Sequence, residues 1–161
     1  MPRLTTKGLR ILEKQNDSCS HYQKMKPLPP HAYGLLLTLD GYGASEKICA
    51  DISGLYRFLE QLPGLIGMRP IGSPHIVSVE EAGIAGLSGF TFIMESHISI
   101  HTYQEKGFVT ADVYSCKNFD TKKVARYLSE YFHTSASESH TIIRGAQFSS
   151  SKNSRARRIA S

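Results

Sequence analysis

The sequence predicts an α+β domain, built as a two-layer sandwich in which helices cover one face of a mostly antiparallel β-sheet. Two observations indicate this class. Short apolar segments alternate with turn residues along the chain, which gives about six candidate strands, and two longer segments repeat apolar residues at helical spacing. Consecutive strands are also separated by few residues, and short connections join strands as antiparallel hairpins.

The first strand and the first helix are predicted in residues 33–64. Residues 33–39 form an apolar run typical of a buried strand, which Asp40-Gly41-Tyr42-Gly43 is expected to stop. Ser45 is the expected N-cap of a helix that ends at Pro63-Gly64. The apolar stripe of this helix recurs every three or four residues and comprises Ile48, Ile52, Leu55, Leu59 and Leu62.

Five further strands and a second helix are expected in the rest of the domain. The strands are predicted at residues 70–79, 90–94, 98–102, 108–115 and 141–143, with a turn at 105–107. Asp120 is expected to cap the second helix, whose buried face comprises Val124, Leu128, Tyr131 and Phe132. The helices would cover one sheet face, and the Tyr-, Phe- and Leu-rich strands favour a partner on the other.

Length and charge predict one domain with two polar ends. The 161 residues suit a single domain, placed at 31–148 because residues 1–30 lack periodicity and end in a proline-rich spacer. Residues 1–30 are therefore predicted to be a flexible N-terminal extension. Residues 149–161 are predicted to be a basic, disordered tail. Because this tail supplies most of the net charge of +5, the charge does not predict a nucleic-acid partner.

The cysteines and the apolar runs predict a cytoplasmic protein. The three cysteines (Cys19, Cys49 and Cys116) are irregularly spaced and contain no CxxC pair, which favours a reducing compartment and argues against structural zinc. The longest apolar run is well short of the roughly 20 residues that a membrane span requires. No apolar region follows the basic N-terminus, so neither a secretory signal nor a membrane partner is expected.

An acid, a serine and a histidine interrupt an apolar strand at Glu95-Ser96-His97. Burying these groups together costs several kcal/mol unless they satisfy one another, which suggests a chemical role. A serine can cleave its own chain if its oxygen attacks the preceding carbonyl, which also requires a base and an oxyanion donor within hydrogen-bond reach. Ser96 is the candidate nucleophile, His101 and His97 are the candidate bases, and Ser88 is the candidate donor.

The histidines are not expected to bind a metal. On a strand, residues 97, 99 and 101 share one face, opposite Ile98 and Ile100. His97 and His101 would then have Cα atoms about 13 Å apart, too far for one ion. The alternative interpretation of either histidine is a half-buried side chain held by a hydrogen bond.

The region resembles the processing site of the prokaryotic S-adenosylmethionine decarboxylases. That family carries Glu-Ser-His, an apolar-rich triplet and His-Thr-aromatic, and this chain has Glu95-Ser96-His97-Ile98-Ser99-Ile100-His101-Thr102-Tyr103. It also carries Ser-Gly before the processed serine, a glutamate after the second histidine, and Asp-Val-aromatic-x-Cys. The matching segments here are Ser88-Gly89, Glu105, and Asp112-Val113-Tyr114-Ser115-Cys116.

The resemblance implies a zymogen that cleaves itself between Glu95 and Ser96, with Ser96 becoming a pyruvoyl cofactor. It further implies that His101 is the processing base assisted by Ser88, that Cys116 reprotonates the substrate, and that Glu105 binds the ribose. Neither a metal nor pyridoxal phosphate would be needed. The family builds its active sites where protomers meet, which implies a homo-oligomer, expected to be a dimer. The product, decarboxylated S-adenosylmethionine, would serve spermidine biosynthesis.

One segment departs from the family pattern. The family places an aromatic residue a few positions before Ser-Gly to stack on adenine, whereas residues 80–87 contain none. Phe90, Tyr103 or an aromatic residue of the partner could replace it. Glu80 and Glu81 suit a cationic substrate instead, so a pyruvoyl-dependent arginine or ornithine decarboxylase is an alternative. A second alternative is a non-catalytic relative that acts as an interaction module.

Overall fold

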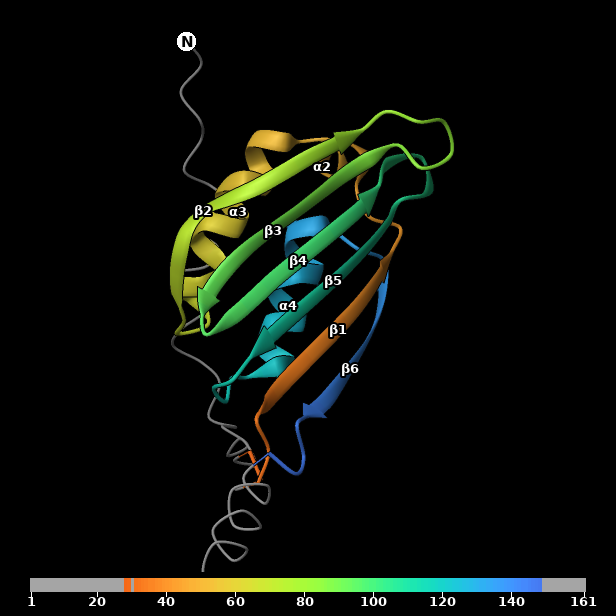
Figure 1. Cartoon of the computed structure of the whole chain (residues 1–161). Helices are drawn as coiled ribbons and strands as arrows, with labels where there is room; N and C mark the ends of the chain where they lie inside the picture. Colours follow the sequence, from red (N-terminus) through yellow and green to blue (C-terminus); the bar gives the residue numbers. More distant parts are fainter. Residues whose placement is uncertain (1–27, 30, 149–161) are drawn as a thin grey trace, which may run out of the picture.

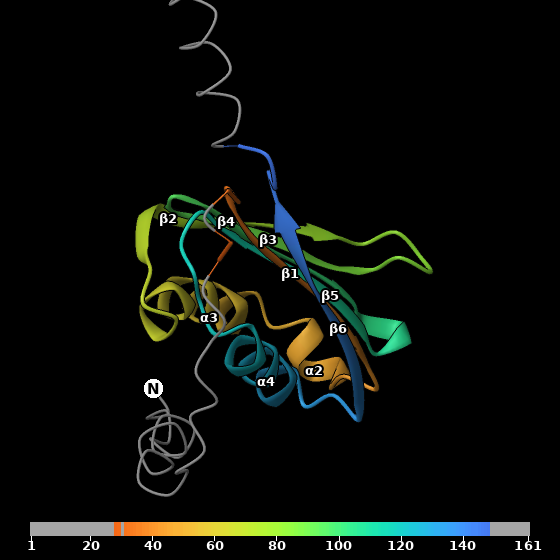
Figure 2. The ribbon, with the colours of Figure 1, turned by 90° about the horizontal axis from the view of Figure 1, so that it is seen from below.

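The computed structural model describes residues 28–29 and 31–148, and these fold into two layers (Figures 1 and 2). One layer is a six-stranded sheet, and the helices form the other. The predicted α+β two-layer class is therefore confirmed. The predicted tail 149–161 and most of the predicted extension 1–30 lie outside the described residues.

The sheet is antiparallel throughout, in the order β2-β3-β4-β5-β1-β6 (Figure 1). Strands β2 to β5 follow one another as hairpins, and β1 lies between β5 and β6. In chain order the elements are β1 (Gly34–Tyr42), α2 (Glu46–Cys49), α3 (Ile52–Leu65), β2 (Arg69–Val79), β3 (Gly86–Met94), β4 (Ser96–Tyr103), the 3₁₀ turn η1 (Gln104–Lys106), β5 (Phe108–Ser115), α4 (Thr121–Phe132) and β6 (Ala136–Arg144).

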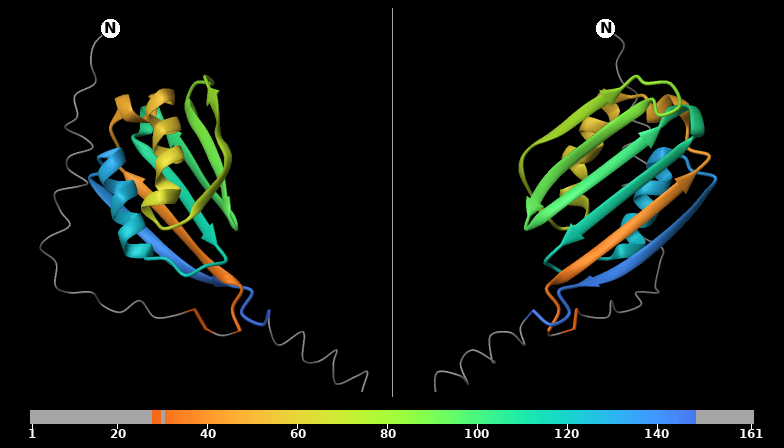
Figure 3. Two further views of the ribbon diagram at one scale, coloured as in Figure 1. Left: turned by 90° about the vertical axis from the view of Figure 1, so that its left-hand side faces the viewer. Right: turned by 45° about the vertical axis from the view of Figure 1, so that its right-hand side comes forward.

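The core lies between the sheet and the helices. Helix α3 packs on β2 and β3, and α4 packs on β1 and β6, so that each helix covers half of the sheet (Figure 3). The largest fully buried side chains are Leu37, Leu39, Leu55, Leu59, Leu62, Ile93, Ile98, Ile100, Val109, Val113, Leu128 and Phe132. This burial explains why most strand residues that face the helices are apolar.

The other side of the sheet carries no described helix, and we call it the open face. It bears His75 of β2, Phe90 and Phe92 of β3, and His97 and His101 of β4. On β4, Ile98 and Ile100 are fully buried against the helices, whereas His97 and His101 are exposed. The predicted alternation along this strand is confirmed.

The predicted single helix is two helices, which corrects the sequence prediction. The chain leaves helical geometry at Asp51, where ψ is 88°, and Asp51 Oδ1 accepts a hydrogen bond of 2.8 Å from the Gly54 backbone N–H. Ser45 makes no side-chain cap bond. A carboxylate cap also complements the positive N-terminal end of α3, so the longer helix begins after Asp51. The helix that follows Ser45, α2, is a single turn.

The helix also ends one residue later than predicted, because α3 continues through Pro63-Gly64 to Leu65. Proline in the last turn removes only its own backbone donor, and the ring is buried in the core. Gly67 then takes a left-handed conformation with φ of 73°, which ends the helical segment.

The other elements agree with the prediction in place, although several strands are longer. The strand at 108–115 and the helix capped by Asp120 are confirmed, and Asp120 Oδ1 accepts from the Lys123 N–H at 2.9 Å. β1 runs to Tyr42 instead of stopping at Leu39, because it lies between β5 and β6 and its backbone is paired on both sides. Pairing with β1 likewise extends β6 over residues 136–144.

Candidate active site

Ser96 and Cys116 meet at one end of the sheet. Ser96 begins β4 directly after the turn that joins it to β3, and Cys116 follows the last residue of β5. The register pairs Ser96 with Ser115, which places Cys116 beside it. Ser96 Oγ lies 3.5 Å from Cys116 Sγ, and both side chains are half-buried. A hydroxyl and a thiol, twenty residues apart in sequence, thus share one site.

The carbonyl before Ser96 has a donor of its own. The Cys116 backbone N–H points to the Glu95 carbonyl oxygen at 3.4 Å. Attack on this carbonyl would place negative charge on that oxygen, and a backbone N–H at this position can stabilise it. Sequence reasoning missed this donor, because a backbone group carries no residue signature. The only available signal was the place of Cys116, one residue beyond a strand that pairs with β4.

The Ser96 backbone is strained. Its φ is 130°, in a region that residues with a side chain rarely adopt. Such conformations persist only where the surroundings fix them, and they cluster at functional sites. The strain falls at the bond that the sequence interpretation singled out for cleavage.

Ser88 and His101 form a second pair on the open face. Ser88 of β3 lies opposite His101 of β4, and its Oγ is 2.9 Å from His101 Nδ1. This bond fixes the orientation of the imidazole, and in the tautomer in which Nδ1–H donates to Ser88 Oγ, Nε2 can act as a base. The predicted association of these two residues is therefore present in the fold.

The two pairs are far apart within one chain. Ser96 and His101 are five positions apart on β4, which corresponds to about 16 Å along an extended strand. The sequence interpretation placed the nucleophile, the base and the donor within hydrogen-bond reach. The structure brings Ser96 together with Cys116, and Ser88 with His101, but it does not bring the two pairs together in one copy.

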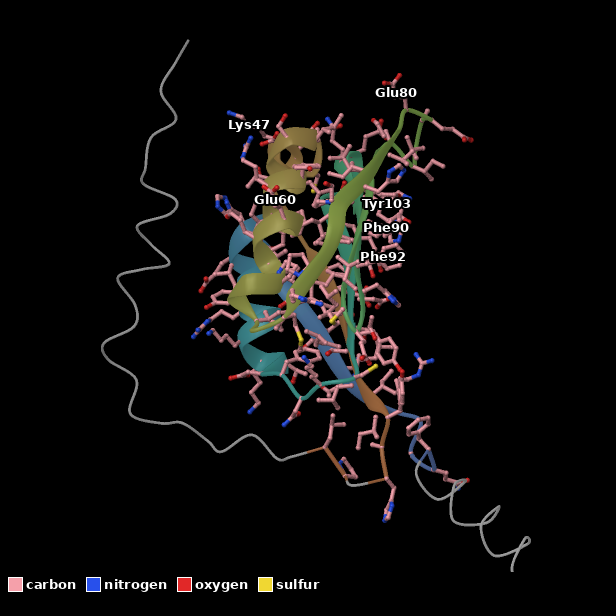
Figure 4. All side chains as sticks on the ribbon, turned by 60° about the vertical axis from the view of Figure 1, so that its left-hand side comes forward. Lys47, Glu60, Glu80, Phe90, Phe92 and Tyr103 are labelled. Carbon is pink, nitrogen blue, oxygen red and sulfur yellow. The ribbon has the colours of Figure 1, made fainter. Side chains whose placement is uncertain are left out.

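A shallow pocket of about 370 Å³ lies on the open face, over strands β2, β3 and β4. Its walls include Ser88 and His101 at one end and His97 at the other, with the aromatic rings of His75, Phe90 and Phe92 along β2 and β3. Figure 4 shows Phe90, Phe92 and Tyr103 projecting to this same side, away from the helix layer that carries Glu60. These rings are candidates for the stacking surface that residues 80–87 lack.

The remaining predicted residues lie at the far end of β4. Glu105 belongs to η1, directly after Tyr103, and it is exposed. Glu80 and Glu81 lie in the β2–β3 loop and are exposed, and Figure 4 places Glu80 near the tip of that loop. The fold therefore puts Glu105 in the turn that follows the strand of His101, and the acidic pair on a neighbouring loop.

Two further findings apply to residues 28–29 and 31–148. No group of three or more His, Cys, Asp or Glu side chains within this part of the chain is arranged to hold a metal ion. None of its helices is both long and apolar enough to cross a membrane.

Known proteins are similar to this chain in sequence and in fold. The sequence model of the S-adenosylmethionine decarboxylase family matches residues 35–145. The crystal structure of the adenosylmethionine decarboxylase from Aquifex aeolicus is similar with a TM-score of 0.62 and 26% identity, covering 71% of this chain and 92% of that chain. The chain belongs to the S-adenosylmethionine decarboxylase family, and the predicted resemblance is confirmed.

Curated relatives are S-adenosylmethionine decarboxylase proenzymes of prokaryotes. The relative from Pyrobaculum islandicum is 34% identical over 95 residues, which cover 59% of this chain and 70% of that protein. The relative from Pyrococcus horikoshii is 41% identical over 63 residues, which cover 38% of this chain and 45% of that protein. The match to the Bacillus velezensis relative covers 48% of its length, so several matches span about half of the relative.

Proposed function

We propose that the chain is the proenzyme of a pyruvoyl-dependent decarboxylase, and that its substrate is S-adenosylmethionine. One observation carries the proposal: the Ser96 hydroxyl, the Glu95 carbonyl and the Cys116 thiol and N–H meet at a strained backbone position. These residues fit the formation of a pyruvoyl group, because a nucleophile, a scissile carbonyl and an oxyanion donor are already in place. The family membership and the names of the relatives support the substrate.

Self-cleavage follows from these groups. Ser96 Oγ attacks the Glu95 carbonyl carbon, the Cys116 N–H stabilises the oxyanion, and the peptide nitrogen leaves as an amine, which gives an ester. A base then removes the Ser96 Cα proton, and the Glu95 carboxylate departs. The dehydroalanine left behind tautomerises, and water replaces its nitrogen, which leaves as ammonia. Residue 96 then carries a ketone.

The second copy of the chain supplies the base. Within one copy His101 is about 16 Å along the strand from Ser96, beyond the reach of proton transfer. Two protomers that meet through their open faces would bring Ser88 and His101 of one copy to Ser96 of the other. The exposed aromatic surface supports this arrangement, since Phe90 is 38% and Phe92 54% exposed. We therefore expect a homodimer.

Protonation of the substrate carbon, the step that follows decarboxylation, depends on Cys116. The pyruvoyl group provides the electron sink for loss of CO₂ from an α-amino acid. Cys116 lies beside residue 96, where its thiol can deliver a proton to the substrate carbon after CO₂ leaves. Decarboxylated S-adenosylmethionine would then serve spermidine biosynthesis, and we expect the enzyme to work in the cytoplasm.

A basic amino acid is the second candidate substrate. The absence of an aromatic residue in 80–87, together with Glu80 and Glu81, favours arginine or ornithine. Both glutamates are exposed in the β2–β3 loop, so a substrate could use them only where the partner protomer closes over that loop. The third candidate, a non-catalytic interaction module, does not account for the close Ser96–Cys116 and Ser88–His101 contacts.

One experiment tests the proposal in two stages. Purified protein should appear as fragments 1–95 and 96–161, with the second blocked to Edman sequencing by its ketone, while Ser96→Ala remains one 17.9 kDa chain. The cleaved protein is then incubated with carboxyl-labelled S-adenosylmethionine, arginine and ornithine in parallel. We expect CO₂ release from S-adenosylmethionine. An intact wild-type chain that still releases CO₂ would contradict the mechanism, and an intact inactive chain would favour the interaction module.

A further inference from the structure

Thr102 is a buried polar residue that has no role in the proposed function. It follows His101 on β4, lies on the helix side of the sheet and is only 3% exposed. In the segment His101-Thr102-Tyr103 only the histidine has been given a chemical task. A buried hydroxyl is costly unless it is hydrogen-bonded, so its partners indicate what it holds in place.

The Thr102 hydroxyl bridges two backbone groups. Its Oγ1 accepts a hydrogen bond of 2.9 Å from the Leu87 N–H and donates one of 2.7 Å to the Cys49 carbonyl oxygen. The Leu87 carbonyl oxygen is farther away, at 3.5 Å. Because a hydroxyl has a single proton, the shorter contact with Cys49 takes it. One side chain thus satisfies a donor of β3 and an acceptor at the end of α2.

The first of these bonds lies at the end of the pairing between β3 and β4. Ser88 and His101 form the last cross-strand pair at this end of the two strands. One step further on, the Leu87 N–H donates to the Thr102 side chain. Leu87 precedes Ser88 and Thr102 follows His101, so the hydroxyl joins the chain neighbours of the pair. The bond therefore limits how far Ser88 and His101 can move apart.

The two backbones approach closely at this point. A Cβ atom at position 86 would lie 1.8 Å from the Thr102 carbonyl oxygen, so only glycine fits there. The next backbone bond runs from the Gln104 N–H to the Ala85 carbonyl oxygen at 2.9 Å. The hydroxyl bond lies between this contact and the Ser88–His101 pair. Residues 85–87 and 102–104 are thereby held together beside the pair.

The second bond joins the same point to the helix layer. Cys49 is the last residue of α2, and the last carbonyl groups of a helix have no partner within the helix. Cys49 is fully buried and Leu87 is 3% exposed, so neither backbone group can turn to solvent. Loss of the hydroxyl would remove a partner from both groups, which is costly for buried backbone atoms.

We propose that Thr102 is a positioning residue for the Ser88–His101 pair. Its hydroxyl holds the Leu87 backbone against β4 and α2, and this keeps Ser88 Oγ within hydrogen-bond distance of His101 Nδ1, at 2.9 Å. The proposal rests on the proposed function in assigning His101 as the processing base. Thr102 does not touch the reacting atoms, since its side chain points to the opposite side of the sheet from His101.

Four substitutions separate the hydroxyl from the rest of the side chain. Thr102→Val keeps the shape and removes the hydroxyl, whereas Thr102→Ser keeps the hydroxyl and removes the methyl group. Thr91→Val is the matched control, because Thr91 of β3 is 1% exposed and its Oγ1 has no hydrogen-bond partner among the residues that the structure describes. Thr102→Cys, whose thiol is a weak donor and acceptor, replaces Thr102→Val if valine prevents folding.

The His101 ring tests the contact without reference to catalysis. Nitrogen NMR of uncleaved Ser96→Ala protein, at a pH where the imidazole is neutral, reports which ring nitrogen carries the proton. Adding His101→Ala identifies the signals of this ring. We expect the Nδ1–H tautomer in the parent chain, in Thr91→Val and in Thr102→Ser. In Thr102→Val, where the bond to Ser88 is loosened, we expect a mixture of the two tautomers.

Self-cleavage, followed by gel densitometry in chains that keep Ser96, tests the consequence. Thr102→Val should cleave itself about tenfold more slowly, and Thr102→Cys about threefold more slowly, as expected for one lost or weakened hydrogen bond. Thr102→Ser and Thr91→Val should cleave at the wild-type rate. In a His101→Ala background Thr102→Val should slow cleavage no further, since Thr102 acts through the ring.

The possible outcomes separate the two proposals. An unchanged His101 spectrum in folded Thr102→Val would overturn the inference, as would a normal cleavage rate of this variant beside a wild type that cleaves itself. Equal slowing by Thr102→Ser would also overturn it, because the effect would then belong to the methyl group. A changed His101 spectrum in Thr102→Val, beside a wild type that never cleaves itself, would support the positioning role and refute the proposed function.

Discussion

The two faces of the same sheet have opposite chemistry. The face under α3 and α4 is closed by aliphatic side chains, and Ile98 and Ile100 of β4 are fully buried there. The open face of the same strand carries His97 and His101, with Phe92 of β3 beside them at 54% exposure. One strand therefore supplies both the core and the candidate chemistry, with alternate residues.

This difference supports the proposal that one protomer folds by itself and that catalysis requires a second copy. The apolar side chains of the covered face are buried by helices of the same chain. The open face leaves large aromatic rings in water and separates His101 from Ser96 by about 16 Å of strand. Both features are resolved if a second copy covers the open face.

The largest effect that we expect is that the Ser88–His101 pair and the Ser96–Cys116 pair act at different stages of the reaction. His101→Ala should slow self-cleavage by about 10² to 10⁴-fold, the usual contribution of a general base. Cys116→Ala keeps a backbone N–H at the Glu95 carbonyl, so it should cleave itself but lose turnover. Gel densitometry of freshly purified protein and CO₂ release measure the two stages. Equal and complete loss of cleavage in both variants would remove this division of roles.

Alanine substitutions on the covered face should destabilise the fold, whereas those on the open face should weaken association between protomers. Ile98→Ala leaves a cavity under the helices and should lower the free energy of unfolding by about 2–5 kcal/mol. Phe92→Ala should change it by less than about 0.5 kcal/mol, because the ring is exposed in the protomer. Phe92→Ala should instead weaken association. Denaturant titration on dilute protein and sedimentation at micromolar concentration separate the two effects, and a monomeric, fully active wild type would refute the role given to the open face.

The acidic residues at the far end of the sheet should report the substrate. Glu105→Ala should weaken apparent affinity for S-adenosylmethionine by about 10- to 150-fold, through loss of a charge-assisted hydrogen bond to the ribose. Glu80→Ala and Glu81→Ala are the matched controls and should change it little. Steady-state kinetics on all three decide the question: normal S-adenosylmethionine turnover by Glu105→Ala, with a raised KM for arginine or ornithine in the other two, would favour the alternative substrate.

Much of this was predictable from the sequence, because alternation and capping are local. The strand at 108–115 follows from the alternation of its apolar residues, and the helix that begins after Asp120 follows from its helical apolar spacing and its N-cap. The break at Asp51 was not predictable from the apolar stripe, since the stripe continues across it and the competing caps Ser45 and Asp51 are both acceptable. Strand ends at Tyr42 and Arg144 depend on pairing with neighbours far away in sequence.

The candidate site divides in the same way. Ser96, Ser88 and His101 were found from residue type and position, and Cys116 from the family resemblance. Their separation into two pairs follows from the rise per residue that already argued against a metal site at His97 and His101. The Cys116 N–H had no sequence signature, because the register of β4 and β5 brings it to the site.

The most direct test of the account is complementation between two inactive copies. A Ser96→Ala chain and a His101→Ala chain, carrying different affinity tags, are co-expressed and isolated as mixed dimers. In such a dimer the His101→Ala chain keeps its scissile serine and meets an intact His101 from its partner. We predict that this chain is cut between Glu95 and Ser96 in the mixed dimer and remains largely uncut when expressed alone. A His101→Ala chain that stays intact beside its partner, or that is fully cut without one, would contradict a site shared between copies.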